Sequence, residues 1–223
     1  MSPPLTPPHT TGESTHPWLS QGVLPVVVVN NPAQALAIAE GLLQGGIEQI
    51  EITLRTPAAI PAIRDIARQF PSMRVSAGTV LTPDQFEQAA DAGASVFISP
   101  GLTETLAAHA KSKRYRWVPG VATASEMMRA LELGFELLKF FPAMAAGGPK
   151  ALAGIAAPLP VAKLVPTGGV SLQNIAEWRA IPAVQAVGGT WLTAGLEDET
   201  DVVDVVKRRA AQALAAWRGQ VLV

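Results

Sequence analysis

One pattern repeats along most of the sequence: a short apolar run, then an alanine-rich segment with helical spacing, with glycine or proline between them. Alternation of short buried strands with helices is typical of βαβ units, in which the strands run parallel. The apolar runs lie at 24–29, 47–54, 73–78, 95–99, 115–119, 136–141, 162–167 and 183–189. Eight such units in about 200 residues predict a single closed (β/α)8 TIM barrel.

An open doubly wound sheet is the alternative fold for alternating strands and helices. Such sheets usually have fewer strands, and their first turn often carries a G-x-G-x-x-G phosphate-binding fingerprint. The segment after the run 24–29 holds no such fingerprint. The closed barrel is therefore favoured, and 223 residues suit one domain of this type.

Charge and composition exclude several classes of function. With 17 basic and 18 acidic residues, the chain lacks the excess positive charge that nucleic acids or anionic membranes attract, so we expect neither as a partner. Cysteine is absent, which excludes disulfides, thiolate zinc sites and a cysteine nucleophile. Neither a membrane-spanning run nor a secretory leader is evident, so we expect a cytoplasmic protein.

The first residues differ in composition from the rest. Residues 1–17 are rich in proline, threonine and serine, a composition that buries too little apolar surface to offset the entropy cost of ordering. We expect residues 1–17 to form a mobile N-terminal arm and residues 18–223 to form the barrel domain.

Polar residues alternate along the second apolar run. Side chains in a strand point to opposite faces in turn, so Glu51, Thr53 and Arg55 share one face. The other face is apolar and suits the helix layer, which leaves the polar face directed inward or to the mouth of the barrel. A purely structural ion pair between Glu51 and Arg55 is the alternative reading.

Lys139 stands in the apolar stretch LLKFF, residues 137–141. It shares a strand face with Leu137 and Phe141, which predicts a lysine inside the barrel. Burial disfavours the charged ammonium form, and a neutral amine is a nucleophile able to form a Schiff base with a ketone. The alternative is a surface lysine that lays its stem along apolar neighbours.

Two glycine pairs follow the last two predicted strands. Gly168 and Gly169 come after the seventh, and Gly188 and Gly189 end the eighth. Glycine lets backbone N–H groups approach an anion closely, and the loops after these two strands are the recurrent phosphate site of TIM barrels. The two pairs together predict a phosphate-binding site.

A series of short motifs runs in order along the chain from about Pro25 to Leu192. These motifs are EITLRTP (51–57), AGTVL (77–81), ISPGLT (98–103), VPG (118–120), KFFPA (139–143), GGPKAL (147–152), PTGG (166–169) and GGTWL (188–192). Through them the chain resembles the 2-keto-3-deoxy-6-phosphogluconate aldolase family. The resemblance implies a class I aldolase on a (β/α)8 barrel, assembled as a homotrimer.

The resemblance also implies roles for individual residues. Lys139 falls on the Schiff-base lysine, Glu51 on the general base, and Arg55 and Thr79 on the contacts to the pyruvate carboxylate. Thr167 falls on the threonine that influences stereochemistry. The matched motifs assign further substrate-binding positions, which are Pro100, Phe141, Gly168, Gly169, Gly188, Gly189 and Thr190.

The implied reaction is the reversible cleavage of 2-dehydro-3-deoxy-6-phosphogluconate to pyruvate and glyceraldehyde 3-phosphate. It would use no cofactor and no metal. Alternative substrates within the resemblance are 4-hydroxy-2-oxoglutarate and 2-dehydro-3-deoxy-6-phosphogalactonate. Outside it, the barrel could be a phosphate-binding isomerase or a catalytically silent binding protein, because a fold alone does not fix a function.

Three features depart from the family pattern. Met144 stands where the family commonly has glutamate, and Ser76 stands where it has glycine. The segment 111–120, KSKRYRWVPG, is bulkier and more basic than the usual approach to the fifth strand. None of these positions carries one of the implied catalytic roles.

Overall fold

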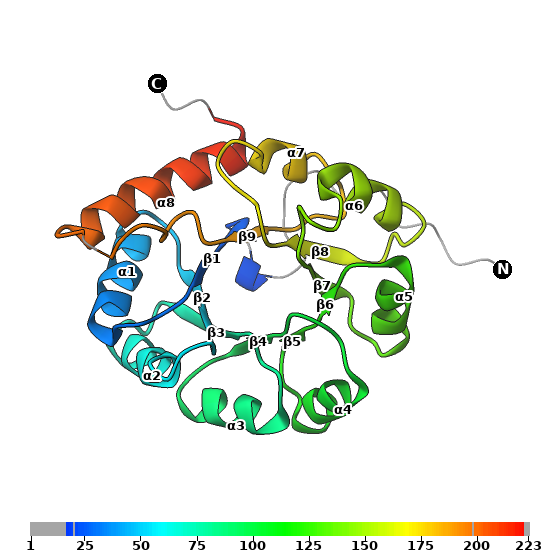
Figure 1. The fold of residues 1–223 in the computed structure, drawn as a ribbon, viewed down its shortest axis with the longest axis horizontal. Coiled ribbons are helices and arrows are strands. Elements are labelled where there is room, and N and C mark those ends of the chain that lie inside the picture. Colours follow the sequence, from blue (N-terminus) through cyan, green and yellow to red (C-terminus); the bar gives the residue numbers. More distant parts are fainter. Residues whose placement is uncertain (1–16, 20, 198, 221–223) are drawn as a thin grey trace.

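The computed structural model of the chain describes residues 17–19, 21–197 and 199–220. In that part, parallel strands form a ring that is surrounded by helices (Figure 1). The predicted (β/α)8 barrel is confirmed. Residues 1–16 of the expected N-terminal arm lie outside the described residues, whereas Pro17 begins the short 3-10 helix η1 (Pro17–Leu19).

The strands pair in parallel around the ring. A six-stranded sheet runs in the order β5-β4-β3-β2-β1-β9, and a second sheet runs in the order β6-β7-β8. The bridge between Thr167 and Gly188 joins the second sheet to the first. The strands are β1 (Val23–Val27), β2 (Gln49–Thr53), β3 (Arg74–Gly78), β4 (Val96–Ile98), β5 (Trp117–Val118), β6 (Gly120–Val121), β7 (Leu137–Phe140), β8 (Lys163–Pro166) and β9 (Val187–Gly189).

Nine labelled strands in the described residues occupy eight positions of the barrel, because Pro119 divides the fifth position into β5 and β6. Proline has no backbone N–H and cannot donate to the ladder. Its carbonyl still accepts a hydrogen bond from the Lys139 N–H at 2.9 Å, which continues the pairing with β7. The eighth predicted run, 183–189, forms a strand only over its last three residues.

The helices begin where the sequence offers capping residues. Thr82, Thr103 and Thr123 each accept a hydrogen bond from a backbone N–H in the first turn, which satisfies a donor that the helix itself leaves unpaired. Among the described residues, no helix is long and apolar enough to cross a membrane. The helices are α1 (Pro32–Gln44), α2 (Ala59–Gln69), α3 (Pro83–Asp91), α4 (Glu104–Lys113), α5 (Ala124–Glu132), α6 (Gly148–Ala156), α7 (Ile175–Arg179) and α8 (Val202–Arg218).

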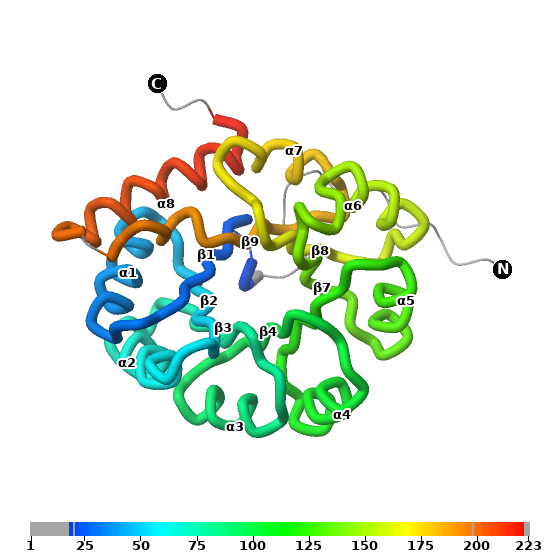
Figure 2. The backbone as a smooth tube through the Cα atoms, viewed as in Figure 1, coloured from blue at the N-terminus to red at the C-terminus, as the bar shows by residue number. Residues whose placement is uncertain are grey.

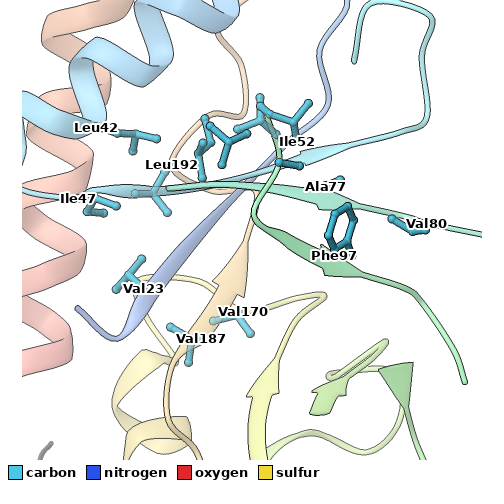
Figure 3. Close-up of a cluster of buried hydrophobic side chains, with 14 of the residues drawn as sticks. Val23, Leu42, Ile47, Ile52, Ala77, Val80, Phe97, Val170, Val187 and Leu192 are labelled. Atoms are coloured by element: carbon cyan, nitrogen blue, oxygen red, sulfur yellow. The ribbon is translucent and has the colours of Figure 1, made fainter. Parts of the chain in front are cut away.

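Alternation of side chains gives the barrel two apolar clusters. The larger cluster fills the layer between strands and helices, and Figure 3 shows Ile52, Ala77 and Phe97 within it. The smaller cluster lies inside the ring and includes Leu24 and Ile98. The tube view shows the short segment of η1, in blue, inside the ring (Figure 2), and Leu19 of η1 joins the inner cluster.

A polar network links α3 to α4 and to the chain before β5. Glu87 accepts a hydrogen bond from the Tyr115 hydroxyl at 2.9 Å, and its other carboxylate oxygen lies 3.2 Å from the Lys113 ammonium. His109 Nε2 lies 3.0 Å from that second oxygen. The hydrogen bond from Tyr115, followed by the interaction with Lys113, lowers the pKa of Glu87 below its ordinary value of 4.5.

We expect Glu87→Gln to lower the free energy of unfolding at neutral pH but not in acid. A carboxyl group with a depressed folded pKa stabilises the fold above its unfolded pKa, and this contribution disappears as the pH falls through the folded pKa. Urea unfolding of both proteins from about pH 7 to about pH 3 measures the difference. A difference that stays constant down to the lowest pH would contradict this assignment.

Candidate active site

A lysine and a glutamate meet inside the barrel. Lys139 on β7 places its Nζ 2.9 Å from Oε1 of Glu51 on β2. Lys139 is only 7% exposed and Glu51 is fully buried. Lys139 therefore lies inside the barrel, as its strand face predicts, and the surface-lysine reading is wrong. Glu51 pairs with Lys139 instead of Arg55.

The strand registers explain how the two groups face the barrel axis. Glu51 lies opposite Val26 on β1 and Ser76 on β3, while Lys139 lies opposite Gly120 on β6. Neighbours in register across parallel strands point to the same side of the sheet. The apolar residues that alternate with the pair along the same strands face the helices.

Gly78 at the end of β3 makes room for the Glu51 carboxylate. A Cβ atom on Gly78 would lie 2.2 Å from Glu51 Oε1, well inside van der Waals contact. Gly78 lies in the motif AGTVL, but the sequence alone predicts no separate role for it. The available signal is a glycine that ends a predicted strand, since glycine in a strand often marks a close approach of another group.

The pair borders a small chamber in the barrel. The Glu51 Oε2 atom is buried there, and no hydrogen-bond partner for it is found in the described part of the chain. A buried carboxylate oxygen is a strong acceptor, so it is suited to take a hydrogen bond or a proton from a bound molecule. The chamber is lined by Trp18, Leu24, Glu51, Ile98, Val118, Lys139, Val165 and Thr167.

Further predicted residues lie where strands end at the barrel mouth. Arg55 follows β2 and donates a hydrogen bond from Nε to the Thr79 hydroxyl at 3.3 Å, so the two proposed carboxylate contacts lie side by side. Thr79 has φ of +58°, an unfavourable backbone conformation for a branched residue. The Phe141 ring centroid lies 5.4 Å from the Lys139 Nζ. Pro100 follows β4 and is half-buried.

Gly168 and Gly169 form the turn after β8. Both have positive φ, +99° and +78°, which side chains other than glycine rarely adopt. The Asn174 side chain donates to the Gly169 carbonyl at 3.0 Å and accepts from the Ser171 N–H, which fixes the turn. Consecutive turn amides of this kind are suited to bind an anion.

Side-chain packing gives Gly188 and Gly189 a reason to be glycine besides the predicted phosphate site. Neither adopts a positive φ. A Cβ atom on Gly188 would lie 2.4 Å from the Thr167 hydroxyl, and one on Gly189 would lie 2.2 Å from the Trp191 ring. Glycine is therefore required by side-chain packing here, while the bridge from Thr167 to Gly188 sets the two loops side by side. Thr190, directly after the pair, is exposed.

Groups suited to hold a metal ion do not gather in this site. Within the described ranges, no three histidine, aspartate or glutamate side chains converge. His109 lies in α4 and contacts Glu87, away from the Lys139 chamber. His9 and His16 lie outside the described residues.

Comparisons with known proteins agree with the geometry. The model of the KDPG and KHG aldolase family matches residues 19–208. A 2-dehydro-3-deoxy-phosphogluconate aldolase of Pseudomonas aeruginosa is 42% identical over 199 residues, covering 88% of this chain and 90% of the relative. The KHG/KDPG aldolase of Escherichia coli K12 is 41% identical over 192 residues, covering 86% and 90%.

Comparison with solved structures also finds KDPG aldolases. A KDPG aldolase from Legionella pneumophila, with pyruvate captured as a covalent carbinolamine, superposes with a TM-score of 0.83 at 37% identity. The match covers 88% of this chain and 97% of that one. The Zymomonas mobilis ZM4 enzyme with 3-phosphoglycerate has a TM-score of 0.82 at 39% identity, covering 87% and 91%.

A parallel α/β barrel with a buried lysine and glutamate in contact defines a class of barrel enzymes in which an amine can attack a carbonyl group. Within that class, the chain belongs to the KDPG and KHG aldolase family. It is accordingly a lyase.

Gly78→Ala tests whether the glycine exists to admit the Glu51 carboxylate. The added methyl group must displace Glu51, so we expect a loss of about 1–3 kcal/mol in the free energy of unfolding. In a Glu51→Ala background the same substitution should cost less than about 0.5 kcal/mol, because the obstructing side chain is gone. Urea unfolding of the four proteins completes the cycle.

Gly154→Ala provides the matched control for that cycle. Gly154 lies within α6, and a Cβ atom there meets nothing within 4 Å. Alanine in a helix interior is favoured over glycine by about 0.5–1 kcal/mol, so this variant should be slightly more stable. An equal cost of Gly78→Ala in both backgrounds would remove Glu51 as the reason for the glycine.

Proposed function

We propose that this protein reversibly cleaves 2-dehydro-3-deoxy-6-phosphogluconate to pyruvate and glyceraldehyde 3-phosphate, through a Schiff base on Lys139. The observation that carries the proposal is the 2.9 Å contact between a buried lysine and a buried glutamate inside the barrel. Relatives about 40% identical over most of the chain bear the name of this aldolase, which supports the choice of substrate.

The first half of the reaction builds the Schiff base. Transfer of a proton from the Lys139 ammonium to Glu51 leaves a free amine, which adds to the C2 ketone and forms a carbinolamine. Glu51 returns the proton to the carbinolamine hydroxyl, which leaves as water, so that an iminium ion and an ionised Glu51 remain. The Legionella relative was captured with pyruvate as a carbinolamine, which supports this order of events.

The second half breaks the C3–C4 bond. Glu51, through a water molecule, takes the proton of the C4 hydroxyl, and the bonding electrons flow into the iminium as the aldehyde leaves. The remaining enamine of pyruvate receives a proton at C3 from the same carboxyl group. Hydrolysis then releases pyruvate and restores Lys139. The unpartnered Oε2 atom of Glu51 suits this proton transfer.

The residues around Lys139 and Glu51 would each bind a different part of the substrate. Arg55 and Thr79 would bind the ketoacid carboxylate, since a guanidinium offers paired donors to a carboxylate. Pro100 and Phe141 would border the reacting carbons. Thr167 lines the chamber beside Lys139 and would influence the configuration accepted at C4.

The distal phosphate would lie against the paired glycine loops. The turn of Gly168 and Gly169 would offer its backbone N–H groups, and the loop that begins at Gly188 and Gly189 would add the Thr190 hydroxyl. The contact between the loops, made by the bridge from Thr167 to Gly188, supports a single binding site.

Metal and cofactor have no step in this mechanism, because the protonated Schiff base itself accepts the electrons released on cleavage.

We further infer a cytoplasmic homotrimer, since the resemblance implies trimers and phosphorylated sugar acids are metabolites of the cell interior. Exposed apolar side chains such as Val28, Leu81 and Val161 offer surface for contacts between subunits.

Lys139→Met should abolish both cleavage and covalent capture of pyruvate. Methionine keeps much of the apolar volume but has no amine to form the Schiff base. Incubation with pyruvate and borohydride followed by mass measurement detects the reduced adduct. Lys163→Met, at the start of the neighbouring strand β8, is the matched control and should still be trapped. An adduct on Lys139→Met at the rate of the unchanged protein would place the nucleophile elsewhere.

The phosphate site predicts a strong preference for the phosphorylated substrate. Removing the phosphate should lower kcat/KM on the order of 10²-fold or more, because remote binding energy contributes to transition-state stabilisation. Thr190→Val should reduce this preference while pyruvate trapping at Lys139 continues. Steady-state kinetics with both substrates measure the ratio. Equal kcat/KM values in the unchanged protein would refute the phosphate assignment.

A further inference from the structure

A second cavity opens at the end of the barrel opposite the strand ends that carry the candidate active site. Arg74, Trp117 and Leu137 line it, and they begin β3, β5 and β7. The strands therefore start at this cavity and end at the glycine loops. Its volume is about 590 Å³, within the range of roughly 300–1,000 Å³ that is typical of small-molecule sites.

Aromatic side chains form much of the cavity wall. Tyr115 stacks on Phe86, with ring centroids 5.6 Å apart, and Phe135 packs edge-on against Trp117 at 5.0 Å. Trp18 of η1 differs, because it is half-buried and makes no ring contact with another described residue. Its indole is suited to stack against a flat ring of a ligand.

Positive charge borders the same cavity. Arg74 forms an ion pair with Glu48 at 3.4 Å, whereas the exposed Arg116 side chain makes no hydrogen bond or ion pair within the described residues. Lys111 lies over the Phe135 ring, 5.8 Å from its centroid. The exposed Glu136 is the acidic member of the lining. Arg116 is therefore suited to bind an anionic group of a ligand.

The cavity is separate from the Lys139 chamber. Trp18 and Val118 line both spaces and form the wall between them. A molecule in the cavity would contact this wall from the side where the strands start, while the substrate would enter from the glycine loops, where the strands end. The basic and aromatic segment 111–117, which has no part in the proposed aldol chemistry, contributes three residues to the lining.

We propose that this cavity is a second binding site, for a small anion that carries a flat ring, with the ring stacked on Trp18 and the anionic group held by Arg116. A nucleoside monophosphate combines the two features at a size that the cavity holds. An aromatic carboxylate would satisfy the same chemistry.

Calorimetric titration of the full chain with adenosine monophosphate tests the site. Arg116→Gln should weaken binding about tenfold, because a hydrogen bond to a charged group is lost. Arg114→Gln is the matched control. It removes the same charge two residues before Arg116, and the Arg114 side chain does not line the cavity, so the affinity should stay unchanged. Trp18→Leu should weaken binding by a similar factor through loss of stacking.

Simpler ligands separate the two requirements. Adenosine has the ring without the charge, inorganic phosphate has the charge without the ring, and each should bind at least about tenfold more weakly than adenosine monophosphate. Benzoate binding that depends on Arg116 would identify the site as one for aromatic carboxylates.

Three results would overturn the proposal. The first is that neither adenosine monophosphate nor benzoate binds. The second is that Arg116→Gln and Arg114→Gln bind adenosine monophosphate with equal affinity. The third is that inorganic phosphate displaces adenosine monophosphate and binds as tightly as the nucleotide does. None of the measurements uses an aldolase substrate, so their outcome is independent of the proposed reaction.

Discussion

The contact between Lys139 and Glu51 imposes the strictest demands on this fold. Two ionisable groups stand beside the apolar cluster inside the barrel, where each loses its hydration. A buried charge without a partner is strongly unfavourable, so neither residue can be placed independently of the other. The closed ring of strands brings the two groups together, because it directs the inward side chains of β2 and β7 toward a common axis. The neighbouring strands fix the registers of β2 and β7.

The close packing around Lys139 and Glu51 also requires glycine at nearby positions. Gly78 leaves room for the Glu51 carboxylate, and a Cβ atom on Gly120 would lie 2.1 Å from the Pro100 carbonyl oxygen. The chain after β4 therefore passes close to the chain at β6, beside the strand that carries Lys139. Small residues at these points let backbone and charged side chains approach within ordinary contact distance. A well-packed interior tolerates no added methyl group there without a shift of its neighbours.

The sequence predicts the barrel and the inward direction of both charged groups, because alternation and period-two patterning are local properties. Their contact is not local, since 88 residues separate them and only the registers of the intervening strands bring them together. The sequence thus leaves Arg55 as the apparent partner of Glu51, although Arg55 instead donates to Thr79. Gly188 shows the same limit: its place in the phosphate loop is predicted, but its contact with Thr167 depends on closure of the ring.

The two ends of the barrel are closed unequally, and this asymmetry determines how protons and substrate reach the pair. At the strand starts, Trp18 and Leu19 of η1 pack against the inner apolar cluster and close the chamber from below. At the strand ends, Arg55 and Thr190 are exposed and the glycine turns supply polar backbone. In the proposed reaction, water and polar substrate would therefore approach Lys139 from the end that carries the proposed binding groups. Because Trp18 of η1 and Val118 of β5 border both the Lys139 chamber and the second cavity, the floor beneath the reacting atoms depends on this short helix as well as on the barrel strands.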